Sequence, residues 1–206
     1  MTRASGTEGY AAEAEALFVQ YESLPFEHVQ RWTLPLIPAT PRRILEIGAG
    51  TGRDAAGFAA LGHSVVAVEP TSELRTRAAA LHPSPAIEWV DDSLPDLGAV
   101  MTRRDTFDVL MMTAVWMHLD EGQRRRAMPN IAALMRPGAL VFMTLRHGPV
   151  PPGRRMFDIS GDETIALARQ TGLDVVFNTW TPEGIQKRPG VSWTRLAFAR
   201  PVGEAI

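Results

Sequence analysis

Residues 44–52 read Ile-Leu-Glu-Ile-Gly-Ala-Gly-Thr-Gly, a short apolar run that ends in three alternating glycines. A run of this length bounded by glycine predicts a buried strand that enters a tight turn. A helical pattern follows from Arg53 to Leu61. A glycine turn between a strand and a helix lets a ligand approach the backbone, and the helix N-terminus favours polar or anionic groups. The stretch therefore predicts a ligand-binding corner in an α/β fold.

Strand and helix patterns alternate along the rest of the chain. Further strands are predicted at 64–69, 86–90, 107–113, 139–145, 173–180 and 191–199, and helices at 71–81, 120–135 and 161–171. The alternation predicts right-handed crossovers and a parallel sheet with helices on both faces. Only a loop separates the last two strands, so we expect them to be antiparallel neighbours at a sheet edge. Near the N-terminus, Pro25 interrupts an apolar helical pattern and predicts two short helices.

The composition of the chain excludes several classes of function. The 206 residues are 45% hydrophobic and 21% charged, as expected for one globular domain, and the net charge of −2 provides no basic surface for nucleic acid or an anionic membrane. No apolar run approaches the roughly 20 residues of a membrane span, and no signal peptide is visible, so we expect a cytoplasmic protein. Cysteine is absent and the five histidines lack metal-ligand spacing, so we expect no metal site.

Acidic residues follow the second and third predicted strands. Glu69, followed by Pro70, is placed where a carboxylate accepts hydrogen bonds from both hydroxyls of a ribose. This feature fits a nicotinamide cofactor and an adenosyl cofactor equally. Asp91 and Asp92 end the third strand, where an acid can accept from an adenine amino group. The dinucleotide fingerprint GxGxxG requires glycine at the position of Arg53, which argues against a nicotinamide dehydrogenase.

Five sequence motifs follow one another along the chain. They are ILEIGAGTG at 44–52, VVAVEP at 65–70, WVDDSLP at 89–95, FDVLMMTAVWMHLD at 107–120 and RPGALVF at 136–142. With this order and these gaps, residues 42–200 resemble the class I S-adenosylmethionine-dependent methyltransferases of the small-molecule type. The resemblance implies a Rossmann-like, doubly wound sheet of seven strands in the order 3-2-1-4-5-7-6, with strand seven antiparallel. It implies one methyltransferase domain over 42–206, preceded by lid helices or a substrate segment over 1–41.

The resemblance also implies the cofactor, S-adenosylmethionine, and its product, S-adenosylhomocysteine. The implied cofactor-binding residues are Glu46, Gly48, Ala49, Gly50, Gly52, Glu69, Pro70, Asp91, Asp92, Ser93 and Thr113. The glycines would form the floor under the methionine part, with Glu46 at its amino group and Thr113 beside it. Glu69 would take the ribose hydroxyls. The family usually has glycine before its adenine-contacting acid, and because this chain has Asp91 there, either Asp91 or Asp92 is the adenine contact.

Methyl transfer from a sulfonium is an in-line displacement, for which a protein chiefly aligns the reacting atoms. His118 is the candidate general base for an acceptor that must lose a proton, and the alternative is that it packs against or caps the next helix. The candidate substrate-binding residues are Tyr21, Trp116, Arg146 and His147. Core packing is the alternative for Trp116. Arg146, Arg154 and Arg155 flank a loop and either bind a carboxylate or phosphate or form a solvated surface.

The sequence favours an enzyme that methylates O, N or S of a small molecule. An alternative in the same class is an RNA or protein methyltransferase, and the near-neutral charge argues against a nucleic-acid substrate. A third reading is a non-catalytic sensor or partner subunit that binds the adenosyl cofactor, because the motifs report binding rather than turnover. No motif encodes the acceptor or the oligomeric state.

Overall fold

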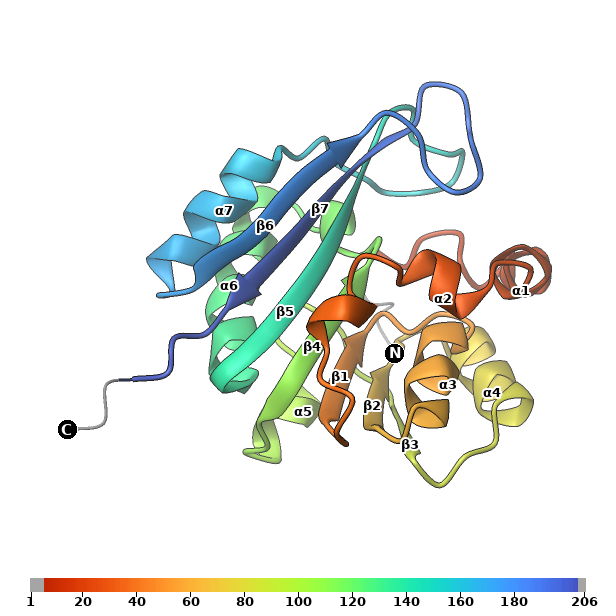
Figure 1. Cartoon of the computed structure of the whole chain (residues 1–206). Helices are drawn as coiled ribbons and strands as arrows, with labels where there is room; N and C mark the ends of the chain where they lie inside the picture. Colours follow the sequence, from red (N-terminus) through yellow and green to blue (C-terminus); the bar gives the residue numbers. More distant parts are fainter. Residues whose placement is uncertain (1–5, 204–206) are drawn as a thin grey trace.

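The apolar run before the glycine turn forms β1, a central strand whose alternate residues are buried on both faces of a sheet. The computed structural model describes residues 6–203, and within them the sheet has seven strands in the order β3-β2-β1-β4-β5-β7-β6 (Figure 1). The strands are β1 (Arg43–Ile47), β2 (Ser64–Val68), β3 (Ile87–Val90), β4 (Phe107–Thr113), β5 (Met135–His147), β6 (Asp174–Thr181) and β7 (Ser192–Ala199). Strand β7 runs antiparallel to both β5 and β6. The predicted order and the antiparallel strand are confirmed.

Helices cover both faces of the sheet. They are α1 (Ala14–Glu22), α2 (Phe26–Val29), η1 (Leu34–Leu36), α3 (Arg53–Ala60), α4 (Ser72–Leu81), α5 (Gly98–Thr102), η2 (Trp116–His118), α6 (Glu121–Leu134) and α7 (Gly161–Gln170). Helices α5, α6 and α7 pack on one face, and α2 and α3 pack on the other (Figure 1). Helix α1 packs against α4 through Phe18, which contacts Leu74 and Ala78. No helix among residues 6–203 is long and apolar enough to cross a membrane.

One strand boundary and one helix differ from the sequence-based expectation. Strand β5 begins at Met135, four residues before the predicted start, because Phe107 of β4 pairs with Met135 and the register then shifts past Pro137. Proline lacks a backbone N–H and is tolerated where such a shift interrupts the ladder. Helix α5 was not predicted, since its five residues are too few to show a helical period.

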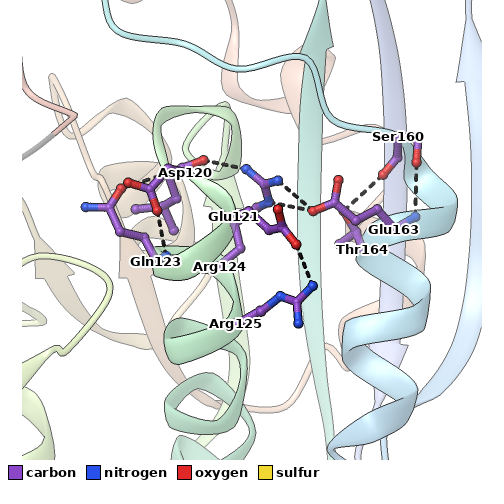
Figure 2. A network of polar contacts seen from close by, with 9 residues as sticks. Asp120, Glu121, Gln123, Arg124, Arg125, Ser160, Glu163 and Thr164 are labelled. Atoms are coloured by element: carbon purple, nitrogen blue, oxygen red, sulfur yellow. Dashed lines mark hydrogen bonds and ion pairs between the residues drawn. The ribbon is translucent and has the colours of Figure 1, made fainter.

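A polar network joins α6 to α7 behind the sheet (Figure 2). Asp120 caps α6, with Gln123 completing a capping box. Arg124 Nη2 lies 2.6 Å from a Glu163 carboxylate oxygen on α7, and its Nη1 donates to the Leu119 carbonyl at 2.6 Å. The network therefore fixes the first turn of α6 and, with it, the preceding turn that carries His118.

Close packing of α2 on α3 makes Gly57 a sensitive position. A Cβ atom there would lie 2.3 Å from the Phe26 ring. In an open helix, alanine in place of glycine stabilises by roughly 0.5–1 kcal/mol, whereas overpacking costs about 1–3 kcal/mol. We therefore expect Gly57→Ala to lower the free energy of unfolding by about 1 kcal/mol or more, measured by urea denaturation. Gly98→Ala, whose Cβ meets no atom within 4 Å, is the control and should not destabilise; equal effects would contradict the prediction.

Candidate active site

A pocket of about 490 Å³ lies at the carboxyl ends of β1, β2 and β4. Strands β1 and β4 are neighbours at the point where the chain order reverses, which is where ligands bind in doubly wound sheets. The N-terminal segment, defined here as residues 6–21, contributes Tyr10, Leu17 and Tyr21 to the lining. From the centre of the sheet the pocket continues along β5 and β7 to the loop between β6 and β7.

The glycine turn forms one wall of the pocket. Gly48 and Ala49 donate their backbone N–H groups to the Val68 carbonyl at 2.8 and 2.9 Å, which ties the turn to the end of β2. Gly50 has φ +60°, and a Cβ there would meet no atom within 4 Å, so the backbone is open toward the pocket. Gly52, predicted as part of the floor, does not line the pocket. It begins α3 and turns toward Trp89, which would lie 2.7 Å from its Cβ.

Glu69 sits at the end of β2 and is 5% exposed. Its Oε2 accepts from the Gly50 backbone N–H at 2.9 Å, and its Oε1 accepts from the Thr71 N–H at 2.8 Å. Burial raises the pKa of this carboxyl, while the two N–H donors oppose the shift. Each carboxylate oxygen has capacity for a further donor, so the oriented group can take two hydroxyls from the pocket side. Pro70 lines the pocket beside it.

Three buried carboxylates gather behind the glycine turn. Glu46, Asp54 and Glu69 are each no more than 5% exposed, and Arg53 is the cation paired with them, through Nε to Asp54 at 2.7 Å. Within the described residues, Glu46 Oε2 has no hydrogen-bond partner. Burial raises the pKa of Glu46 well above its ordinary value, and the nearby Asp54 carboxylate raises it further. This excess of acid favours a cation in the pocket.

Asp54 and Gln30 were not predicted as site residues. Gln30 follows α2 and donates through Nε2 to Asp54 at 2.6 Å and to the Thr113 hydroxyl at 3.3 Å. All three line the pocket, so Thr113 lies where the prediction that it contacts the methionine part of the cofactor requires. In the sequence, Asp54 resembles an ordinary acid in the first turn of a helix, and nothing marks Gln30.

The structure distinguishes between the two acids after β3. Asp92 and Ser93 line the pocket, and Asp91 does not. The Asp91 side chain is 68% exposed and pairs with Arg75 at 2.9 Å, so of the two predicted adenine contacts only Asp92 faces the pocket. Asp92 accepts from the Ser93 N–H at 2.8 Å and from the Val100 N–H at 3.0 Å, which holds the carboxylate at the pocket edge.

His118 lines the pocket and is buried. Its Nδ1 lies 2.7 Å from the Arg155 carbonyl and its Nε2 lies 3.0 Å from the Tyr10 hydroxyl. A carbonyl oxygen only accepts, so Nδ1 carries hydrogen and Nε2 accepts from Tyr10. Burial lowers the pKa of His118, and burial raises the pKa of the Tyr10 hydroxyl. The pair is therefore a neutral imidazole and a protonated phenol at neutral pH.

Arg154 lines the pocket and Arg155 does not, and both pair with acids of the chain. Arg154 donates to the Glu13 carboxylate at 2.7 Å and its guanidinium lies 4.0 Å from the Tyr10 ring centroid, so it secures the N-terminal segment. Arg155 donates to the Asp120 carboxylate at 2.9 Å.

Two predicted substrate residues lie off the pocket. Trp116 is completely buried in the core and does not line the pocket. It therefore packs in the core, which was the alternative to a role in substrate binding. His147 bonds through Nε2 to the Thr194 hydroxyl at 2.8 Å, and it does not line the pocket. Successive residues of a strand point to opposite faces, which is why Arg146 lines the pocket and His147 does not.

A family model described as a methyltransferase domain matches residues 44–138, which include the glycine turn, Glu69 and His118. Residues 44–138 of the chain are therefore similar to a methyltransferase domain. The matched region ends near the start of β5, so the rest of the sheet and the N-terminal segment lie outside it.

Relatives and solved structures are also similar to the chain. It is 33% identical over 104 residues to an uncharacterized methyltransferase of Mycobacterium tuberculosis, and the match spans 50% of this chain but only 39% of that protein. It is 26% identical over 222 residues to glycine N-methyltransferase of Rattus norvegicus, covering 93% of this chain and 75% of the rat protein. A 1,6-didemethyltoxoflavin-N1-methyltransferase of Burkholderia thailandensis, solved with S-adenosylhomocysteine, shares the fold at a TM-score of 0.73 and 18% identity, covering 93% and 85% of the two chains.

The buried His118 gives a pH-dependent contribution to stability. Because its folded pKa is lowered, the unfolded chain takes up the proton first, and the contribution falls as pH drops through about 6.5. We expect His118→Gln to cost about 1–2 kcal/mol near pH 8, through its lost hydrogen bonds, and distinctly less near pH 5.5. Thermal unfolding of both proteins over this range measures the difference, and a gap that widens on acidification would contradict it.

Proposed function

We propose that this chain transfers a methyl group from S-adenosylmethionine to O, N or S of a small molecule. One observation carries the proposal: a single pocket joins the glycine turn, Glu69 and Asp92 to a second region between the N-terminal segment and β5–β7. A cofactor at the first region and an acceptor at the second would therefore share one space, as an in-line displacement requires.

The residues present suit this cofactor. The unpartnered Glu46 Oε2 and the neighbouring carboxylates suit an ammonium and a sulfonium, and Gly50 leaves room at the backbone. Glu69 would hold the ribose hydroxyls, and Asp92 with Ser93 would hold the adenine. When bound, S-adenosylmethionine supplies an already activated methyl group, so the residues of the chain mainly align the acceptor.

His118 is the proposed general base for an acceptor that carries a proton. Its Nε2 accepts from Tyr10, whose ring also lines the pocket, so the proton of an acceptor would reach His118 through the Tyr10 hydroxyl or after Tyr10 moves aside. The Arg155 carbonyl holds Nδ1–H and leaves Nε2 as the basic atom. A neutral imidazole at neutral pH is the form that this role requires.

A small acceptor suits the enclosure. The N-terminal segment lines the pocket and is held by Arg154 and by the Tyr10–His118 bond, so it would act as the lid of the active site. Residues 1–5 of the predicted 1–41 segment, and residues 204–206 of the predicted domain, lie outside the described residues. A relative named for glycine and a structural neighbour named for 1,6-didemethyltoxoflavin also support a small-molecule acceptor.

Calorimetry with S-adenosylmethionine and S-adenosylhomocysteine tests cofactor binding. We expect both to bind, and we expect mass spectrometry of a metabolite extract to show a gain of one methylene mass on an acceptor only when protein and S-adenosylmethionine are present. No binding at millimolar cofactor would contradict the proposal. Binding without turnover across a broad extract would favour a sensor or partner subunit instead.

A further inference from the structure

We propose that the methyl acceptor is a small aromatic carboxylate, whose carboxylate group is bound by Arg146, Arg188 and Arg195. This inference rests on the proposed function, because it assigns the second region of the same pocket. All three arginines line the pocket where it reaches β5, β7 and the loop between β6 and β7. We call this region the arginine end.

Arg195 on β7 is the anchor of the arginine end. Its side chain is buried, with 8% of the residue exposed, and its Nη1 donates to the Thr181 hydroxyl at 2.7 Å. Among residues 6–203 it forms no ion pair with a carboxylate. Burial lowers its pKa, and the nearby positive charge of Arg31 lowers it further. Burying a guanidinium without a carboxylate partner costs free energy, and a bound anion would offset that cost.

Arg146 points to the same side of the sheet. In the antiparallel pairing of β5 with β7, Thr144 lies opposite Arg195 and Arg146 lies opposite Trp193. Arg146 and Arg195 are therefore diagonal neighbours on one face, at a spacing within reach of long side chains. The described chain gives Arg146 no ion pair either, and burial together with the charge of Arg188 lowers its pKa.

Elsewhere in the described chain, most arginines are paired with an acid. Examples are Arg124 with Glu163 and Arg154 with Glu13, both at or below 2.7 Å. The pocket is thus divided by charge, with the carboxylates of Glu46 and its neighbours at the glycine turn and unpaired guanidiniums at the arginine end. A cationic cofactor and an anionic acceptor would match the two ends.

Aromatic side chains at the arginine end suit a planar body. Trp32, Phe177 and Trp193 line the same part of the pocket. Trp32 is 44% exposed, which is unusual for so large an apolar side chain, and the Arg195 guanidinium lies 5.9 Å from its ring centroid. Aromatic walls stack on flat rings, and guanidiniums bind carboxylates through paired N–H donors.

The test separates the acceptor from the cofactor. Calorimetry first measures S-adenosylhomocysteine binding by the wild-type chain and by Arg195→Met, Arg188→Gln and Arg125→Gln. With this ligand saturating, binding is then measured for benzoate, phenylacetate and indole-3-carboxylate, each paired with its neutral amide. Arg188 is exposed on a loop, so its variant tests the inference even if Arg195→Met folds poorly. Arg125, exposed on α6 and paired with Glu121, is the matched control.

We expect the wild type to bind at least one acid about tenfold or more tightly than its amide. Arg195→Met should lose that preference, and Arg188→Gln should weaken it, while S-adenosylhomocysteine affinity stays within about twofold. If S-adenosylhomocysteine binds but every acid binds no better than its amide, the carboxylate inference is wrong and the proposed function stands. If S-adenosylhomocysteine does not bind, the proposed function fails and the inference fails with it.

Discussion

Glu69→Ala is expected to lower the affinity for S-adenosylhomocysteine by about a hundredfold or more. Two hydroxyl bonds to an ionised carboxylate contribute about 1.5–3 kcal/mol each, and both would be lost. The substitution also leaves the Gly50 and Thr71 N–H groups without their acceptor, so the glycine turn would lose one of its ties to the end of β2. Calorimetry at constant pH measures the loss directly.

Two comparisons show whether the ribose contact is responsible. Glu88→Ala removes an exposed glutamate on β3 that pairs with Arg103, and it should leave the affinity unchanged. The wild type should prefer adenosine to 2′-deoxyadenosine, and the Glu69 variant should bind the two alike. A Glu69→Ala protein that is folded and keeps wild-type affinity would show that the ribose lies elsewhere.

Glu46→Gln is expected to stabilise the ligand-free protein and to weaken its binding of S-adenosylmethionine. The folded state raises the Glu46 pKa, so the folded chain holds this proton more tightly than the unfolded chain and loses stability as pH rises above 4.5. Removing the charge avoids that cost at neutral pH. The midpoint of thermal unfolding should rise by about 2–4 °C, which corresponds to about 1 kcal/mol for a chain of this size.

Affinity should change in the opposite direction. A neutral amide loses the attraction for the cationic cofactor, so we expect about tenfold weaker binding of S-adenosylmethionine. The stability gain should shrink near pH 5, where the wild-type carboxyl is itself protonated. Glu88→Gln, at an exposed site, should show neither effect. Lower stability together with unchanged affinity would mean that Glu46 is a structural residue and not a cofactor ligand.

Sequence alone determined the alternation of strands and helices and the corner that holds the glycine turn, whereas the sheet order was implied by the resemblance of the five motifs to a known family. The alternation and the corner depend on features that are contiguous in the chain: apolar runs with a strand period, glycines directly after β1, and Glu69 directly after β2. The carboxyl ends of parallel strands must meet at one edge of the sheet, so such residues converge whatever the detailed packing. The cap at Asp120 and the break at Pro25 are local in the same sense.

Only the tertiary structure decided which side chains face the pocket. Asp91 and Asp92 are adjacent, as are Arg146 and His147, and in each pair one residue lines the pocket while the other points away. The hydrogen bond between Tyr10 and His118 joins residues 108 positions apart, so no local sequence pattern predicts it. Contacts of this kind depend on strand register and on how helices pack across the sheet. Register and packing orient each side chain, whereas the sequence pattern only places the backbone at the right edge.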